Sequence, residues 1–435
     1  MRFKNSKFIV NNLSLTLSLI ILFSICISCN VTNPTNTALV FELKDIGSTE
    51  VWFTLKSELK PLPLNVIIRN GNKPLINILL TTNDTIIFLD KLKPMSNYSF
   101  TAETIIDVSY IKSKQVNCTT LDTITHDFTW ETFYFGGVGT SVLEDIEIID
   151  ENNIWVVGDI QDAGYDKDSV WQDQHNVVKW NGNEWSLERI FGYGSCTQKY
   201  MYPPPLKGIY KDSQNVIWAS WGNQIINASQ EKIYCEFKTG GFDKLEGFGD
   251  DGMIVTNHTN EKSILNYFKY GRFSEIKLEN NGFIMDLLPI VKDNGEKIIL
   301  FPHSSFQTGK YQLLSINAQK DVSLYATLPN YTSSVWTRKG YPLFICGGSS
   351  VYSNKTGNWK EINCSSPYAV ARISGDNLNN IFAIGWGNVI HYNGSTWKKI
   401  DELDGYYFSV AVKDNIVVIV GMQNYKAVIV VGRKN

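Results

Sequence analysis

Asn153–Gly158 reads NIWVVG, and VKWNGNEW follows it at residues 178–185. The same order returns as NIFAIG at residues 380–385 and IHYNGSTW at residues 390–397. The apolar runs are rich in Val, Ile and aromatic residues, which favour pleated strands. Each Asn-Gly pair favours a tight hairpin with positive φ. The sequence therefore repeats a unit of short antiparallel strands, and this repeat decides the fold.

The repeat extends over residues 128–435. Strands that align with NIWVVG begin near seven positions: Ile154, Ile217, Met253, Ile298, Leu343, Ile381 and Ile416. A four-strand unit that recurs at this spacing is the signature of a β-propeller. We therefore predict an all-β fold whose larger part is a seven-bladed β-propeller over residues 128–435.

The last repeat lacks a fourth strand-like segment after residues 428–431. Phe128–Phe133 reads FTWETF and is similar to the Trp-led outer strands of the other repeats. We predict that Phe128–Phe135 pairs with the last repeat as an N-terminal closing strand, because closure removes open sheet edges.

Composition agrees with an all-β protein. Aromatic side chains make up 13% of the 435 residues, and long helical stripes of apolar residues are missing. Aromatic and β-branched residues suit half-buried sheet surfaces. The net charge of −3 gives no basic footprint for nucleic acid, so no nucleic-acid partner is expected.

Basic residues at the start of the chain precede an apolar run over residues 13–27. A short apolar run with such flanks is typical of a signal peptide. It ends in Cys26-Ile27-Ser28-Cys29, which resembles a bacterial lipobox. The resemblance implies cleavage before Cys29 and lipidation of its thiol. It predicts a lipoprotein signal peptide over residues 1–29, a linker over residues 30–37, and an outer-membrane lipoprotein on the periplasmic side or the cell surface.

Short strand-like runs separated by turn residues fill residues 38–122 and predict a small β-sandwich. Val51-Trp52-Phe53 supplies an early core Trp, and LKPMSNY at residues 92–98 has the spacing of a tyrosine corner. This region resembles a fibronectin type III domain. The resemblance implies that the Tyr98 hydroxyl bonds the backbone across the corner, and that the domain is a spacer or a binding module.

The cysteines beyond the signal peptide are odd in number and irregular in spacing: Cys118, Cys196, Cys235, Cys346 and Cys364. This pattern argues against a disulfide framework, although a single bond can form in an oxidising compartment. No Cys-x-x-Cys pair remains to indicate zinc.

The repeat region resembles the repeat-rich propellers of bacterial lipoproteins, of the kind described as sialidase-like or sensor-type. The Asp-box pattern of sialidases is not met, since Ser353–Trp359 reads SNKTGNW and lacks the Asp. The resemblance therefore implies the fold and leaves the ligand open.

Function in a propeller concentrates in long loops on a rigid scaffold. The two longest loops on the predicted ligand face are residues 159–176 and 191–206, and both combine aromatic side chains with polar or charged ones. Rings stack on the apolar faces of sugars or peptides while carboxylates bind hydroxyls or amides. Our candidate ligand-binding residues in these loops are Asp159, Asp166, Asp168, Trp171, His175, Tyr200 and Tyr202. A solvated insertion without a ligand is the alternative.

A second candidate group lies just past the aligned strands and forms a ring in the alignment. Its members are Trp221, His258, His303 and Trp386, together with Asp159 and Met422. Such residues line a recognition pocket, or they cap the channel as ordinary packing.

We predict no catalytic residue and no cofactor. The carboxylates of residues 159–173 are the ligand type that calcium prefers, so calcium is the alternative, although the EF-hand spacing fails. Neither a Gly-x-Ser-x-Gly elbow nor a His-Glu-x-x-His motif occurs. Gly247–Gly252 matches Gly-x-Gly-x-x-Gly, but a strand is predicted directly after it, where a dinucleotide site needs a helix.

The sequence therefore predicts a membrane-anchored envelope lipoprotein that acts as a non-catalytic recognition module. Its ligand would be a glycan, a peptide or an envelope protein held at the channel mouth. One alternative is a carbohydrate-active hydrolase or lyase that uses carboxylates of the loop at residues 159–176. Another is a structural envelope protein.

Overall fold

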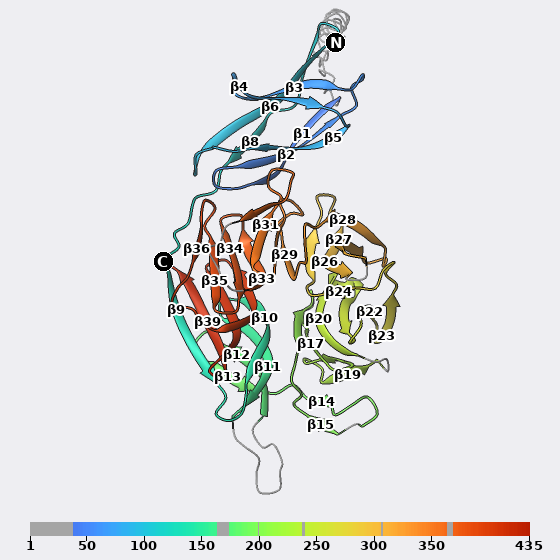
Figure 1. Ribbon diagram of the computed structural model, residues 1–435, viewed down its shortest axis with the longest axis vertical. Helices are drawn as coiled ribbons and strands as arrows, with labels where there is room; N and C mark the ends of the chain where they lie inside the picture. Colours follow the sequence, from blue (N-terminus) through green and yellow to red (C-terminus); the bar gives the residue numbers. More distant parts are fainter. Residues whose placement is uncertain (1–37, 163–173, 199, 237–239, 306–307, 363–368) are drawn as a thin grey trace, which may run out of the picture. The chain divides into compact units, whose positions relative to one another are not determined.

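The computed structural model describes residues 38–162, 174–198, 200–236, 240–305, 308–362 and 369–435 (Figure 1). The described residues are almost entirely β-strands, with one short 3-10 helix at Gly249–Asp251. Among them, no helix has the length and apolar character needed to cross a bilayer. The predicted signal peptide, its Cys29 and the linker lie outside the described residues.

Residues 39–119 form two sheets. The first has the order β1-β2-β5, with β1 at Leu39–Ile46, β2 at Val51–Ser57 and β5 at Asp84–Leu89. The second has the order β4-β3-β6-β7, with β8 also paired to β6, and its strands are β3 Leu64–Asn70, β4 Lys73–Leu80, β6 Asn97–Ile106, β7 Ser109–Lys112 and β8 Val116–Thr119. β3 is antiparallel to both β4 and β6. Buried positions alternate along β3, as expected for a strand with one face in a core.

The predicted corner hydrogen bond is present in this region. The Tyr98 hydroxyl accepts a hydrogen bond from the backbone N–H of Lys93 at 2.8 Å. The bond spans the turn before β6 and fixes the entry of that strand.

The chain divides into two compact units. Of the described residues, one unit contains 38–42 together with Thr54–Thr85 and Ser99–Asn117. The other contains Leu43–Phe53, Ile86–Tyr98 and Cys118–Asn435.

The larger unit contains a series of antiparallel sheets whose strands follow one another in sequence. Their orders are β10-β11-β12-β13, β16-β17-β18-β19, β20-β21-β22-β23, β24-β26-β27-β28 with β25 also on β26, β29-β30-β31-β32, β33-β34-β35-β36 and β37-β38-β39-β9.

In the first three of these sheets the bounds are β10 Val142–Asp150, β11 Asn153–Gln161, β12 Gln174–Trp180, β13 Trp185–Glu188, β16 Gly208–Lys211, β17 Ile217–Trp221, β18 Gln224–Asn227, β19 Lys232–Cys235, β20 Gly241–Gly247, β21 Met253–His258, β22 Ser263–Lys269 and β23 Arg272–Ile276. A separate short hairpin joins the first sheet to the second and consists of β14 Gly192–Tyr193 and β15 Met201–Tyr202.

The remaining bounds are β24 Phe283–Ile284, β25 Leu288–Val291, β26 Lys297–Ser305, β27 Lys310–Asn317, β28 Val322–Thr327, β29 Ser334–Trp336, β30 Phe344–Gly347, β31 Ser350–Ser353, β32 Lys360–Ile362, β33 Val370–Asn377, β34 Asn380–Gly385, β35 Asn388–Tyr392, β36 Trp397–Lys399, β37 Tyr406–Lys413, β38 Ile416–Gln423, β39 Lys426–Lys434 and β9 Phe128–Phe135. Strands therefore occur at or next to all seven positions predicted from the repeat.

The pairing predicted for the N-terminal strand is confirmed. β9 pairs with β39 in an antiparallel ladder from Ala427↔Phe135 to Lys434↔Phe128. The outer strand of the last sheet thus comes from the other end of the repeat region (Figure 1).

The sheets pack as separate open layers in a propeller-like order. No ladder among the described strands joins one four-stranded sheet to the next. Inner strands of successive sheets contact each other, and β37 of the last sheet returns to β10 of the first. Apolar clusters fill the space between sheets: Ile154, Val156 and Val178 of the first sheet pack with Val418 and Ile429 of the last.

The Gly that ends each NIWVVG-like run has a steric cause. A Cβ added at Gly385 would lie 1.8 Å from the carbonyl oxygen of Ala369, and one at Gly158 would lie 2.1 Å from that of Val142. In both sheets the adjacent strand carries a register shift at this level, as at a β-bulge. The repeat keeps Gly here because the neighbouring backbone comes too close for any side chain.

Candidate binding site

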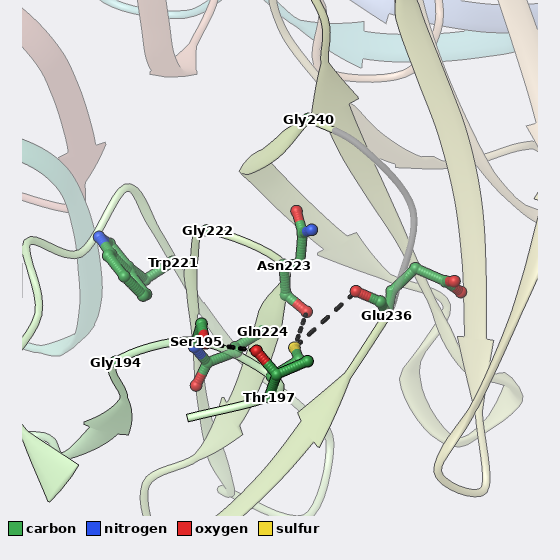
Figure 2. Close-up of a pocket in the computed structure, with 10 residues that line it drawn as sticks. Gly194, Ser195, Thr197, Trp221, Gly222, Asn223, Gln224, Glu236 and Gly240 are labelled. Carbon is green, nitrogen blue, oxygen red and sulfur yellow. Dashed lines mark hydrogen bonds between the residues drawn. The ribbon is translucent and has the colours of Figure 1, made fainter. Parts of the chain in front are cut away.

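Trp221 ends β17 and lines two cavities. The first cavity has a volume of about 340 Å³, and its walls include the loop from Gly194 to Thr197, Gln224 and Glu236 (Figure 2). The second has a volume of about 470 Å³, and its lining includes Asp243 and His258. The half-buried indole of Trp221 is thus accessible from two hollows of small-ligand size.

Two tyrosines of the predicted set extend the aromatic surface at Trp221. The ring of Tyr202 meets Trp221 edge-on, with centroids 5.6 Å apart and planes at 89°. The ring of Tyr200 lies 5.7 Å from that of Tyr202. Tyr200 is largely exposed, whereas Tyr202 is partly buried. The three rings form a continuous aromatic surface whose exposure falls from Tyr200 to Trp221. We call this surface the Trp221 site.

Asp159 belongs to the same site. Burial, together with the neighbouring Tyr200 and Asp159, raises the pKa of Tyr202 to about 12. The Asp159 carboxylate accepts hydrogen bonds from the side-chain amides of Gln174 at 2.9 Å and Gln161 at 3.5 Å. These amides hold the carboxylate in place at the end of β11.

His175 lies next to Asp159 across the β11–β12 ladder, opposite Ile160. Its Nδ1 is 3.4 Å from a carboxylate oxygen of Asp162. The described ends of the loop at residues 159–176 therefore present two carboxylates and one imidazole.

The second cavity is lined by a histidine and a carboxylate that lie close together. Nε2 of His258 is 3.4 Å from a carboxylate oxygen of Asp243, and its Nδ1 is 2.9 Å from the Ser263 hydroxyl. Burial opposes ionisation of Asp243, but the hydrogen bond with His258 and the positive charges of Lys244 and Arg372 outweigh it and lower its pKa. Asp243 therefore stays ionised and acts as an acceptor at the cavity wall.

Two buried amides fix the segment that carries the tyrosines. Gln224 bonds both backbone groups of Tyr193, each at 2.8 Å. Asn176 donates to the carbonyls of Ile190 and Pro204 and accepts from the Ile190 N–H, each at 2.8 Å. The segment is thereby tied to the first sheet on one side and to the second sheet on the other. Sequence reasoning missed both amides, and the only signal was a polar residue inside an apolar strand.

The other predicted residues lie elsewhere. His303 of β26 is buried, and burial lowers its pKa. Trp386 is 56% exposed and meets Tyr406 edge-on at 6.1 Å. Met422 of β38 is in register with Tyr406. These side chains lie in or directly after β26, β34 and β38, which belong to other sheets than β17 of the Trp221 site.

Three candidates cannot be placed, because Asp166, Asp168 and Trp171 lie outside the described residues. The described residues contain no group of three or more His, Cys, Asp or Glu arranged to hold a metal ion. The calcium alternative depends on those undescribed carboxylates and stays a prediction. The Gly247–Gly252 motif is followed by strand β21, as predicted.

No protein-family model matches this chain, and no curated protein matches it. Among solved structures, the extracellular domain of the one component system BT4673 from B. thetaiotaomicron is 10% identical over 69% of this chain and 40% of that chain, with a TM-score of 0.45. This chain therefore spans less than half the length of that protein. The Dos1 propeller is 11% identical over 70% of this chain and 95% of its own, with a TM-score of 0.44. Regucalcin, a calcium-binding protein from Agrobacterium tumefaciens, is 9% identical over 53% of this chain and 91% of its own, with a TM-score of 0.36. Since all three scores are below 0.5, no conclusion about this chain is drawn from them.

Proposed function

We propose that this chain is an exported, lipid-anchored recognition protein that binds a saccharide at the Trp221 site without converting it. The observation that carries the proposal is that Trp221 lines both cavities, with Tyr202 edge-on beside it. A flat aromatic ring at the wall of a cavity suits the apolar face of a sugar, and fixed carboxylates suit its hydroxyls.

The charges at the site favour binding over hydrolysis. A glycosidase needs a protonated carboxylic acid facing a second carboxylate. Asp243 is instead held ionised by its neighbours, and the Asp159 carboxylate is occupied by two amides. The carbohydrate-active alternative would need Asp166 or Asp168, which are not described, and no observation favours it over recognition. A purely structural role would leave the cavities without a ligand.

The same proposal assigns a fold to each part of the chain. The sheets of the larger unit are the blades of a seven-bladed propeller, closed by the β9–β39 ladder, and the inner-strand contacts that return from β37 to β10 support this. Residues 38–122 form a fibronectin type III-like spacer, which the Tyr98–Lys93 hydrogen bond supports. Residues 1–29 form a lipoprotein signal peptide, and the lipid on Cys29 anchors the protein in the outer membrane. Peptides and envelope proteins are the other ligand classes.

Calorimetric titration of the full chain in detergent against an oligosaccharide panel tests the proposal. We expect a saccharide to bind, and Trp221→Ala to weaken it at least tenfold, or about 1.4 kcal/mol. Trp386→Ala is the matched control, because this exposed Trp lies in another sheet, and its variant should bind normally.

Chromatography of the same mixtures detects turnover. Cleavage that disappears in Asp159→Asn would replace the recognition proposal with the hydrolase alternative. Peptide binding, or equal binding by both Trp variants, would reject the saccharide site.

A further inference from the structure

Two cysteines that are distant in sequence meet at the wall of the first cavity. Cys196 lies in the loop between β14 and β15, and Cys235 is the last residue of β19. The Cys196 Sγ lies 3.6 Å from the carbonyl oxygen of Asn223 and 3.8 Å from that of Glu236, the two contacts drawn from sulfur in Figure 2. Cys235 directly precedes Glu236 in the chain, and its thiol interacts with that of Cys196.

The backbone at this point sets the position of Cys235. Cys235 is in register with Gln224 at the end of the β18–β19 ladder. One residue further, the Glu236 N–H donates to the Asn223 carbonyl at 2.9 Å. The loop that carries Cys196 is held by the bonds between Gln224 and Tyr193 described above. Both thiols are therefore held by anchored backbone.

We propose that Cys196 and Cys235 form a disulfide that ties the tyrosine-bearing segment to the edge of the second sheet. The Cys196 Sγ already lies 3.8 Å from the backbone of the residue that follows Cys235, so rotation about the side-chain torsions can bring the two sulfurs to bonding distance. In the reaction the two thiols lose two protons and two electrons and one S–S bond forms. A small-molecule disulfide such as oxidised glutathione takes up the electrons and protons and becomes two thiols.

The surroundings also indicate when the bond forms. Burial, reinforced by the neighbouring Cys235, raises the pKa of Cys196 to about 12. The thiolate is the attacking species in disulfide exchange, so Cys196 attacks slowly once the chain is folded. The bond forms during folding, while both thiols are exposed.

The bond has a consequence for the Trp221 site, although it does not depend on the proposed ligand. It would link a loop next to Tyr200 and Tyr202 to the strand end beside the first cavity. The rings would then keep their positions without a ligand, which lowers the entropy lost on binding.

Peptide mapping of the full chain in detergent tests the bond. The chain is folded in a glutathione redox buffer or in reductant, blocked with N-ethylmaleimide and digested with trypsin. In the redox sample we expect the peptide 190–199, which holds Cys196, linked to the peptide 233–238, which holds Cys235. The reduced sample should carry one alkyl group on each.

The variants Cys196→Ser and Cys118→Ser serve as test and matched control. Cys196→Ser should leave Cys235 alkylated in redox buffer, whereas Cys118→Ser should keep the cross-link. Full alkylation of Cys196 and Cys235 in well-folded redox samples, judged by near-ultraviolet circular dichroism, would overturn the proposal, as would a link from Cys196 to another cysteine. Protein isolated from an oxidising periplasm gives the same comparison without refolding.

Discussion

His391 makes the last two sheets sensitive to acid. Its imidazole stacks on Phe382 with centroids 4.4 Å apart and meets the edge of Phe128 of β9 at 5.0 Å. Its Nδ1 lies 3.0 Å from Nδ1 of His126, and its buried Nε2 finds no hydrogen-bond partner among the described residues. Burial, with the nearby His126 and Lys434, lowers the pKa of His391 to about 3.

The sign and size of the effect follow from linkage. The ordinary pKa of histidine is near 6.5, so below that pH the unfolded chain binds a proton that the folded chain refuses. The stability from neutral His391 is therefore complete above pH 6.5 and is lost as the pH falls toward 3. Between pH 7 and pH 5 the loss is about 2 kcal/mol, or roughly a 30-fold change in the opening equilibrium.

The perturbation is His391→Phe, which keeps the ring stack and removes the titrating group. Hydrogen exchange of the β35 amides, measured by mass spectrometry, reports the local opening free energy. We expect protection of β35 in the wild type to fall roughly 30-fold more between pH 7 and pH 5 than in the variant. Tyr425→Phe, an exposed change in the adjacent sheet, is the matched control. Identical pH dependence in the wild type and His391→Phe would refute the reasoning.

Three further predictions concern the repeat and the site. Gly385→Ala should lower the free energy of unfolding by about 3 kcal/mol, since its Cβ would lie 1.8 Å from a carbonyl oxygen. Urea titration measures this loss. The comparison variant is Gly348→Ala, where nothing lies within 4 Å of the added Cβ but φ is positive, so it reports backbone strain without a clash. Trp130→Ala should lower the free energy of unfolding by about 3 kcal/mol, because it weakens the packing of β9. Deletion of residues 123–136 should unfold the repeat region. An unchanged melting temperature in the deletion variant would contradict the closing role of β9. Gln224→Leu should lower the free energy of unfolding by about 2 kcal/mol, because two backbone groups of Tyr193 lose their hydrogen-bond partners. Unchanged hydrogen exchange at the Tyr193 amide would show that water replaces the Gln224 side chain.

Much of the fold could be predicted because local patterns repeat. The NIWVVG-like runs mark strands, and the Trp-led segment at β9 could be matched to the outer strands by analogy along the chain. The Tyr98 corner also depends on residues close in sequence, since Lys93 is only five positions away. Period-2 strands and short turns are local features, which a single sequence displays.

The site was harder to predict, because its contacts join distant segments. The alignment grouped Trp221 with Trp386 by position in the repeat. The structure gives them different neighbours, since Trp221 meets Tyr202 of the irregular hairpin β14–β15 whereas Trp386 meets Tyr406 of β37. Asn176 reaches Pro204, 28 residues away, and no local pattern signals such a bond. The spacing of Cys196 and Cys235 likewise gave no sign that their thiols meet.

The pairing of β9 with β39 also sets an order of events during synthesis. Phe128 and Lys434 pair although about 300 residues separate them. At the usual 5–20 residues per second, β9 leaves the ribosome roughly 15–60 seconds before its partner exists. During that time the aromatic strand is an unpaired edge, open to chaperones and to other nascent chains. Translation speed and chaperone supply should therefore affect the yield of this protein more strongly than its final stability suggests.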